Sequence, residues 1–230
     1  MGSLDDAGIL DNAAWHALRG PHAAFAESHG SARRYRPDFA RYSALPDARD
    51  DATWRDLARL VGPGAQVSMS GAVIEPPPDW TVTRIGRARQ MVAAEVHERA
   101  DPDVVELTPA DVPEIFALIG RTKPGPWRSK TIHIGRYLGI RHAGRLVAMA
   151  GERVRPPGWV EVSAVCTDEE FRGRGFASRL VGAVVHDIRS RGDEAYLHVS
   201  VNNPVATRLY EGLGFRVRRE TSFVGLTAPA

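Results

Sequence analysis

The clearest hydrophobic pattern in the chain lies over residues 175–191, where large apolar side chains recur every four residues. They are Phe176, Leu180, Val184 and Ile188. This spacing puts them on one face of an amphipathic helix, and Gly192, just beyond, is a common type of helix end. The pattern therefore predicts a helix whose apolar face packs against a core.

The rest of the second half alternates between the two-residue period of strands and short helical stretches. We expect strands at residues 104–107, 137–142, 145–154, 159–167, 195–201 and 215–226. Thr108 and Pro109 begin a helix after the first strand, and residues 202–214 form another short one. Ala143 and Gly144 predict a hairpin turn, so three antiparallel strands follow in a row. The expected order is β-α-β-β-β-α-β-α-β.

The first half has weaker patterns. Apolar residues between 10 and 27 predict two short helices, because Gly20 and Pro21 interrupt them. We further expect a strand at 39–45, a helix at 51–62, a loop at "EPPPDW", and a stretch from 80 to 95 that begins as a strand and becomes ambiguous.

A polar break, "HERADPD" at residues 97–103, predicts a boundary between two regions. We expect an N-terminal α/β region over residues 1–100 and a second domain over residues 101–230. The chain has 230 residues, 43% hydrophobic and 25% charged, which is typical of a globular protein with a real core.

The charge balance limits the partners. Thirty Lys and Arg residues against 28 Asp and Glu residues give a formal net charge of +2, too balanced for a protein that mainly binds nucleic acid or an anionic membrane. Any anion site must therefore be local. Cys166 is the only cysteine, and no Cys/His cluster has zinc spacing, so we expect neither a disulfide nor a metal. Without a signal peptide or a long apolar stretch, the sequence predicts a cytoplasmic protein.

The stretch "FRGRGFAS", residues 171–178, joins a predicted strand to the predicted helix. A helix that begins there offers unpaired backbone amides and the positive end of its dipole, which commonly bind a pyrophosphate. Gly173 and Gly175 would let phosphate approach the backbone, and Arg172 and Arg174 would add charge-assisted hydrogen bonds. The alternative is a glycine-assisted turn with solvated arginines.

A dinucleotide-binding fingerprint is a second reading of the same stretch. Gly173-x-Gly175-x-x-Ser178 is nearly the required pattern, and Asp193 follows twenty residues after the first glycine. However, the third glycine is a serine, the approach from Val165 is too long for a tight turn, and the preceding strands form antiparallel hairpins. A P-loop is excluded, because no Gly-Lys-Ser/Thr follows.

Two stretches together resemble the signatures of the GNAT superfamily of N-acetyltransferases, which use acetyl-CoA. "VEVSAVCTDEEFRGRGFASRLVGAVV" is similar to the family's central strand, pyrophosphate loop and helix. "NNPVATRLYEGLGF" is similar to its second signature, Asn-x-x-Ala-x-x-Leu-Tyr followed by Gly-Phe. The resemblance covers about residues 103–226 and is closest to the glycine N-acyltransferase-like branch. It implies an α/β fold with a mixed, largely antiparallel sheet flanked by helices. The N-terminal α/β extension could be a degenerate second copy of that fold.

Carried over residue by residue, the resemblance implies a coenzyme A site on the strand and the loop. Val165 and Thr167 would present backbone groups to the pantetheine arm, with Cys166 lining the same slot. Asn203 would contact the cofactor near its thioester. The pyrophosphate would bind the backbone amides of Gly173, Arg174, Gly175, Phe176, Ala177 and Ser178, with Arg172 and Arg174 flanking it.

The resemblance also implies catalytic roles. Tyr210 would face the sulfur and supply a proton to the leaving thiolate, and a backbone amide on residues 165–167 could stabilise the oxyanion. Glu161, eleven residues before Arg172, resembles the catalytic glutamate of histone-modifying members and is the candidate base. Each residue has a structural alternative: Asn203 as a helix N-cap, Tyr210 as a core aromatic, and Glu161 on the polar face of a strand.

The implied reaction is transfer of an acetyl group from acetyl-CoA to a primary amine, by direct attack in a ternary complex. The acceptor would be a small-molecule or peptide amine, held by loops that include residues 120–130 and by the N-terminal region. The sequence leaves open whether the protein forms a homodimer. Two rival functions remain: a non-catalytic CoA-binding sensor, which would not need Tyr210, and a dinucleotide-binding oxidoreductase.

Overall fold

One large sheet runs through the protein. The computed structural model describes residues 4–71, 74–98 and 100–230, and within them eight strands pair in the order β4-β11-β5-β10-β9-β8-β7-β6. They are β4 (Gln66–Gly71), β5 (Thr81–Ala93), β6 (Val104–Leu107), β7 (Tyr137–His142), β8 (Arg145–Glu152), β9 (Trp159–Thr167), β10 (Glu194–Ser200) and β11 (Phe215–Thr227). β9 and β10 are parallel, and the other neighbours are antiparallel. The expected mixed, largely antiparallel sheet is confirmed.

Two helices cover opposite faces of this sheet, because successive residues of a strand point to opposite sides. On β8, Ala148 and Ala150 lie in the core beneath α4 (Phe176–Ser190), whereas Met149 lies in the core beneath α3 (Val112–Thr122). The helix predicted at 175–191 is confirmed within a residue at each end. No helix in the described ranges is long and apolar enough to cross a bilayer.

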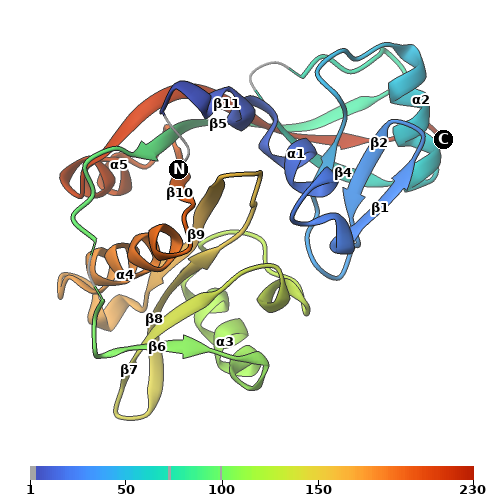
Figure 1. Ribbon diagram of the computed structural model, residues 1–230. Coiled ribbons are helices and arrows are strands. Elements are labelled where there is room, and N and C mark those ends of the chain that lie inside the picture. The colour runs from blue at the N-terminus through green and yellow to red at the C-terminus, as the bar shows by residue number, and fades with distance from the viewer. Residues whose placement is uncertain (1–3, 72–73, 99) are drawn as a thin grey trace.

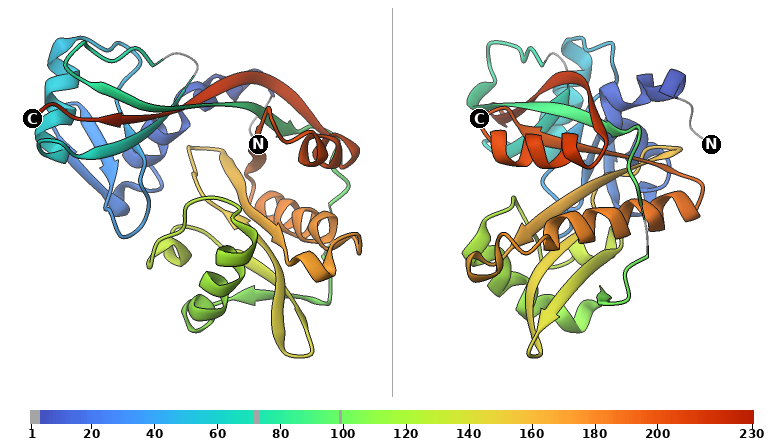
Figure 2. Two further views of the ribbon diagram at one scale, coloured as in Figure 1. Left: turned by 180° about the vertical axis from the view of Figure 1, so that it is seen from behind. Right: turned by 90° about the vertical axis from the view of Figure 1, so that its left-hand side faces the viewer.

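The N-terminal region forms a small sheet of its own, with strands β1 (Ala26–His29), β2 (Ala32–Tyr35) and β3 (Ser43–Ala44). α1 (Ala13–Arg19) and α2 (Asp51–Val61) pack on it, whereas the 3₁₀ helix (Leu4–Asn12) that precedes them packs on residues of the large sheet. The strand expected at 39–45 shrinks to two residues, because Phe39 and Ala40 donate backbone hydrogen bonds back to Arg36 and form a turn. Figure 2 shows the small sheet and α2 gathered at one end of the molecule.

The same region also supplies part of the large sheet. β5, which precedes the predicted boundary at 97–103, lies between β10 and β11. Figure 1 shows β5 and β11 as one long ribbon that reaches from α5 (Pro204–Gly212) to the N-terminal elements. The stretch that was ambiguous from sequence is therefore a strand of 13 residues. Elements on both sides of the predicted boundary share one hydrogen-bonded ladder.

Gly214 holds the start of β11 against the end of β5. Its φ is +97°, and a Cβ at this position would lie 2.4 Å from the carbonyl oxygen of Glu95. The backbone amide of Glu95 donates a hydrogen bond to the carbonyl of Gly214 at 3.0 Å, so the backbones of these two residues are already in contact. Neither the conformation nor the space suits a side chain.

We expect Gly214→Ala to lower the free energy of unfolding by about 2–4 kcal/mol, because it adds both backbone strain and a clash. Gly212→Ala is the matched control, since a Cβ there meets nothing within 4 Å and the position is helical. Urea unfolding of both variants measures the difference. Equal stability of the two variants would contradict this close approach.

Candidate active site

β9 and β10 separate near the middle of the sheet. Their parallel pairing runs from Trp159 opposite Glu194 to Val162 opposite Leu197 and ends there. Both strands continue, β9 paired with β8 as far as Thr167 and β10 paired with β5 as far as Ser200. The result is a wedge-shaped opening between the two strands, which we call the β9–β10 wedge.

A bulge in β9 lies at the start of this wedge. The pairing with β8 shifts register between Ser163 and Cys166, and Ala164 has a φ of +54°. A non-glycine residue in the left-handed region is strained, and such strain is common at binding sites. After the bulge, the amide of Asp168 donates to Val147 on β8 at 2.8 Å. By the alternation of an antiparallel ladder, Thr167 and Val165 direct their backbone groups into the wedge.

Two glycines leave the backbone of the loop after β9 accessible. Gly173 and Gly175 have φ values of +77° and +76°, and a Cβ on either would meet nothing within 4 Å. Gly175 is the N-cap of α4, and no side chain in the described part of the protein caps this helix. The amides of the first turn are therefore available to a ligand, and the helix dipole favours an anion.

The two arginines of this loop lie beside the amides and are held by weak contacts, a long ion pair for Arg172 and a ring contact for Arg174. The Arg172 side chain is 59% exposed and lies 3.8 Å from Glu169. Arg174 stacks over the ring of Phe171, with its guanidinium carbon 4.9 Å from the centroid. Both can therefore reorient toward a phosphate at little cost.

Ion pairs hold α4 at both ends. At its first turn, Arg179 bonds Asp101 at 2.6 Å.

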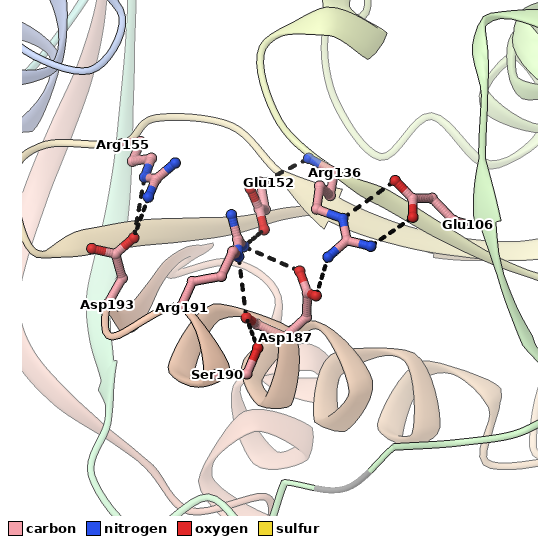
Figure 3. Close-up of polar contacts among 8 residues, drawn as sticks. All are labelled: Glu106, Arg136, Glu152, Arg155, Asp187, Ser190, Arg191 and Asp193. Carbon is pink, nitrogen blue, oxygen red and sulfur yellow. Dashed lines mark hydrogen bonds and ion pairs between the residues drawn. The ribbon is translucent and has the colours of Figure 1, made fainter.

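At the far end of α4, Arg191 bonds Glu152 on β8 and Asp187 on α4 itself, as Figure 3 shows. In the same view Arg136 joins Asp187 to Glu106 on β6, and Arg155 joins Asp193. Cations near a helix C-terminus are favourable, so this network positions the helix that faces the wedge.

Asn203 and Tyr210 lie on α5. The Asn203 side chain accepts a hydrogen bond from the amide of Ala206 at 3.0 Å, so its expected role as N-cap is confirmed. Tyr210 is 8% exposed, belongs to the core beneath α4, and contacts Phe215 edge to face. Burial raises the pKa of Tyr210 to about 12, which keeps the phenol protonated at neutral pH.

Glu161 is buried and both of its carboxylate oxygens are bonded. Arg153 donates to them at 2.8 and 2.5 Å, and His198 Nδ1 lies 2.6 Å away. Burial alone would raise the pKa of Glu161, but Arg153 and His198 outweigh it and lower the pKa to about 2. So acidic a group is a poor proton acceptor at neutral pH. The expectation of Glu161 as the catalytic base is therefore not supported by its surroundings.

The hydrogen bonds of His198 define its tautomer. Gln90 Nε2 lies 3.3 Å from His198 Nε2 and also donates to the carbonyl of Leu10 at 2.9 Å. An amide nitrogen can only donate, so His198 Nε2 accepts and its Nδ1 carries the proton that bonds Glu161. The polar chain therefore ties β9, β10, β5 and the N-terminal 3₁₀ helix together beside the wedge.

Sequence reasoning missed Arg153 and Gln90 as members of this chain. Arg153 comes directly after β8, and Tyr42 lies far away in sequence, yet Arg153 donates to the Tyr42 hydroxyl at 2.8 Å. In the sequence, alternation puts Tyr196, His198 and Ser200 on one face of a strand but does not reveal what they contact. The partners could be found only once the strand register was known.

A small hollow borders the bulge of β9, and a larger one lies in the N-terminal region. A cavity of about 30 Å³ is bordered by residues 124–127, Tyr137, Arg153 and the bulge at Ala164. A cleft of about 200 Å³ is bordered by β2, the turn after it, and Arg128. Part of the loop at 120–130, expected from sequence to surround the acceptor, thus borders both hollows.

Cys166 is not among the residues that border either hollow. It is 8% exposed, packs in the core beneath α3, and burial raises the pKa of its thiol. The thiol is therefore a poor nucleophile. Within the described ranges, no group of His, Cys, Asp and Glu side chains is arranged to hold a metal ion.

Comparisons with known proteins identify relatives of this chain. A family model described as "FR47-like protein" matches residues 137–224. A crystal structure of a protein from Novosphingobium aromaticivorans, assigned as an acetyltransferase of the GNAT family, is 39% identical. The match covers 96% of this chain and 99% of that one, with a TM-score of 0.87.

Two curated mycobacterial proteins are also similar. An uncharacterised protein of Mycobacterium leprae is 34% identical over 154 residues, which is 60% of this chain and 42% of that protein. The N-alpha-acetyltransferase RimI of Mycobacterium tuberculosis is 36% identical over 83 residues, which is 35% of this chain and 51% of that protein. The chain thus spans about half or less of the length of these two relatives.

The low pKa of Glu161 has a consequence for stability. Its folded pKa of about 2 lies below its usual value of 4.5, so the stabilisation is present above pH 4.5 and is lost as the pH falls toward 2. We expect Glu161→Gln to cost about 3–5 kcal/mol at pH 7, because it leaves Arg153 buried without its anion. The gap from the wild type should narrow steadily below about pH 4.5.

Urea unfolding between pH 7 and pH 3 measures this gap. Glu220→Gln is the control, because Glu220 forms an exposed ion pair with Arg87 that should contribute less than about 1 kcal/mol. A pH-independent gap for Glu161→Gln would show that the carboxylate is not the stabilising species.

Proposed function

We propose, from the premise that this chain belongs to the GNAT family of acetyltransferases, that it transfers an acetyl group from acetyl-CoA to a primary amine. The observation that carries the proposal is the β9–β10 wedge, which opens beside the uncapped amides of α4. A backbone-lined slot and an anion-binding helix end suit the two parts of coenzyme A, its amide-bearing arm and its pyrophosphate.

A second feature of the β9–β10 wedge also fits coenzyme A. The hydroxyl oxygen of Thr167 is buried and has no hydrogen-bond partner in the described part of the chain. A buried hydroxyl without a partner costs free energy, and an amide of the pantetheine arm would satisfy it. Thr167 and Val165 would bind that arm through their backbone groups as well, and Cys166 would lie between them on the strand.

The pyrophosphate would be held by the loop. Gly173 and Gly175 keep the approach to the backbone free, and the amides as far as Ser178 would donate to the phosphate oxygens. Arg172 and Arg174 would supply charge from the flanks. The bound thioester supplies an activated acetyl group, which is the chemistry that this site needs.

Three steps of proton and charge movement remain for the protein. The amine nitrogen would form a bond to the acetyl carbon as the carbon–sulfur bond breaks. The nitrogen would release one proton to solvent water, and the sulfur would gain one from Tyr210, which solvent then reprotonates. A backbone amide in residues 165–167 would stabilise the oxyanion, which is often worth about 3 kcal/mol. Tyr210 would donate its proton toward the sulfur, and it keeps that proton up to a pH of about 12.

No side chain of the buried polar chain is free to take the proton of the amine. Glu161 is too acidic, and the Nε2 atom of His198 already accepts from Gln90. We therefore propose that the acceptor enters as the neutral amine and that Glu161 positions His198 rather than acting as a base. The rate should then rise with pH as the acceptor loses its proton.

The glycine loop gives the direct test of the cofactor. We expect Gly175→Glu to abolish both acetyl-CoA binding, measured by calorimetry, and thiol release in the presence of amines. The new carboxylate would occupy the phosphate position and repel the phosphate. Gly192→Glu is the matched control: its φ is +83°, its Cβ would also meet nothing within 4 Å, and it follows the opposite end of α4. Undiminished binding by Gly175→Glu would refute the proposed cofactor position.

The phenol gives the test of the chemistry. We expect Tyr210→Phe to lower kcat roughly 100-fold, by removing the proton donor, while the dissociation constant of acetyl-CoA changes little. The phenyl ring keeps the contact with Phe215, so stability should be preserved. Equal losses in kcat and in cofactor affinity would mean that Tyr210 is only a core aromatic.

A further inference from the structure

The cleft of about 200 Å³ in the N-terminal region is rich in arginine. Arg34, Arg41 and Arg128 border it, and they come from β2, the turn before β3, and the loop after α3. We call it the arginine cleft. Three guanidinium groups around one small hollow repel one another unless anions lie among them.

Only one of these three arginines has an acidic partner in the described parts of the chain. Arg34 bonds Glu27 at 2.7 Å. Arg41 and Arg128 have no carboxylate partner there, and Arg41 is exposed. The cleft therefore keeps a net positive charge of about two, in a protein whose total charge is only +2.

The loop that carries Arg128 holds two buried donors without acceptors. Arg128 Nε and the indole nitrogen of Trp127 are both inaccessible to solvent and have no hydrogen-bond partner in the described structure. Buried donors are nearly always satisfied, so adjacent unsatisfied ones point to a ligand with acceptor atoms. Trp127 borders the small cavity and Arg128 borders the arginine cleft, so one ligand could reach both.

Side-chain contacts connect the arginine cleft to the small cavity at the Ala164 bulge. Tyr42 borders the cleft, and its hydroxyl accepts a hydrogen bond from Arg153 at 2.8 Å. Arg153 in turn borders the small cavity at the Ala164 bulge. A single hydroxyl–guanidinium contact therefore links the wall of the cleft to the wall of the cavity beside the wedge.

We propose that the acceptor is an amine that carries an anionic oxygen group, carboxylate or phosphate, and that the arginine cleft binds this group. Arg41 and Arg128 supply planar pairs of donors that match either anion. The amine end of such a molecule extends through the small cavity toward the wedge. This inference rests on the proposed acetyl transfer for its chemistry, but the anion site can be tested without turnover.

The test uses acceptors that differ in charge alone. A series of ω-amino acids of increasing chain length is compared with the matching ω-amino amides and with ω-aminoalkyl phosphates. Binding is measured by calorimetry and transfer by thiol release from acetyl-CoA. We expect about 10-fold or tighter binding, and a correspondingly lower KM, for an acid of suitable length than for its amide. The phosphate series decides which anion fits better.

Variants locate the site. Arg128→Gln and Arg41→Gln should each raise the KM for the charged acceptor about 10-fold and leave the KM for the neutral amide unchanged. Arg41 is exposed, so its variant tests the cleft even if Arg128→Gln folds poorly. Arg55→Gln, an exposed arginine on α2 that does not border the cleft, is the control and should change neither value.

The outcomes separate the two proposals. If acid, phosphate and amide bind the wild type equally, or none binds, the arginine cleft is not an anion site, whatever the turnover. If the charged molecules bind and lose affinity in the Arg41 and Arg128 variants, but no amine releases thiol, the cleft stands and the proposed acetyl transfer is wrong. Equal losses in Arg55→Gln would also overturn the assignment.

Discussion

The site depends on one constraint, which is that β9 and β10 stop pairing with each other while each keeps its other neighbour. β10 remains bonded to β5 as far as Ser200, and β9 to β8 as far as Thr167. Each strand keeps one edge in its own ladder, and the edge that faces its former neighbour is left without a strand partner. Peptide groups along the gap therefore lack a strand partner, and a buried unpaired peptide group costs about 1–3 kcal/mol. A ligand with amides along its length would recover this energy, which is how a gap in a sheet can become a binding slot.

The buried polar chain lies where the strands part. Glu161 and Tyr196 form one of the last pairs before the gap, and Glu161 bonds both Arg153 and His198. Burying such charges is costly, and apolar side chains would often be as stable. A fully bonded chain instead fixes the relative positions of the strands, because each member accepts only one geometry. In this protein it links β8, β9, β10 and β5, the four strands whose positions define the wedge.

The N-terminal region also contributes to the proposed site. Its strand β5 completes the sheet beside β10, and its turn at Arg41 and Tyr42 forms a wall of the arginine cleft. The contact between Tyr42 and Arg153 joins that wall to the wedge. The wedge is thus lined by the part of the chain that resembles the family, and the cleft by the N-terminal region together with Arg128. The proposed selection of the acceptor therefore belongs largely to the N-terminal region.

The sequence by itself determined the local elements, including the strand, loop and helix that carry the proposed cofactor site. The four-residue period fixed α4, the glycines of residues 171–178 fixed an open helix start, and Asn203 with Pro204 fixed the start of α5, because these signals act within a few residues of the chain. The place of β5, the partners of Glu161 and the arginine cleft were decided only by the tertiary structure. Each of these depends on pairing between residues far apart in sequence, and strand register carries no local signal that reveals its partner. The acidity of Glu161 follows from the same fact, since its pKa is set by Arg153 and His198, which the fold brings to it.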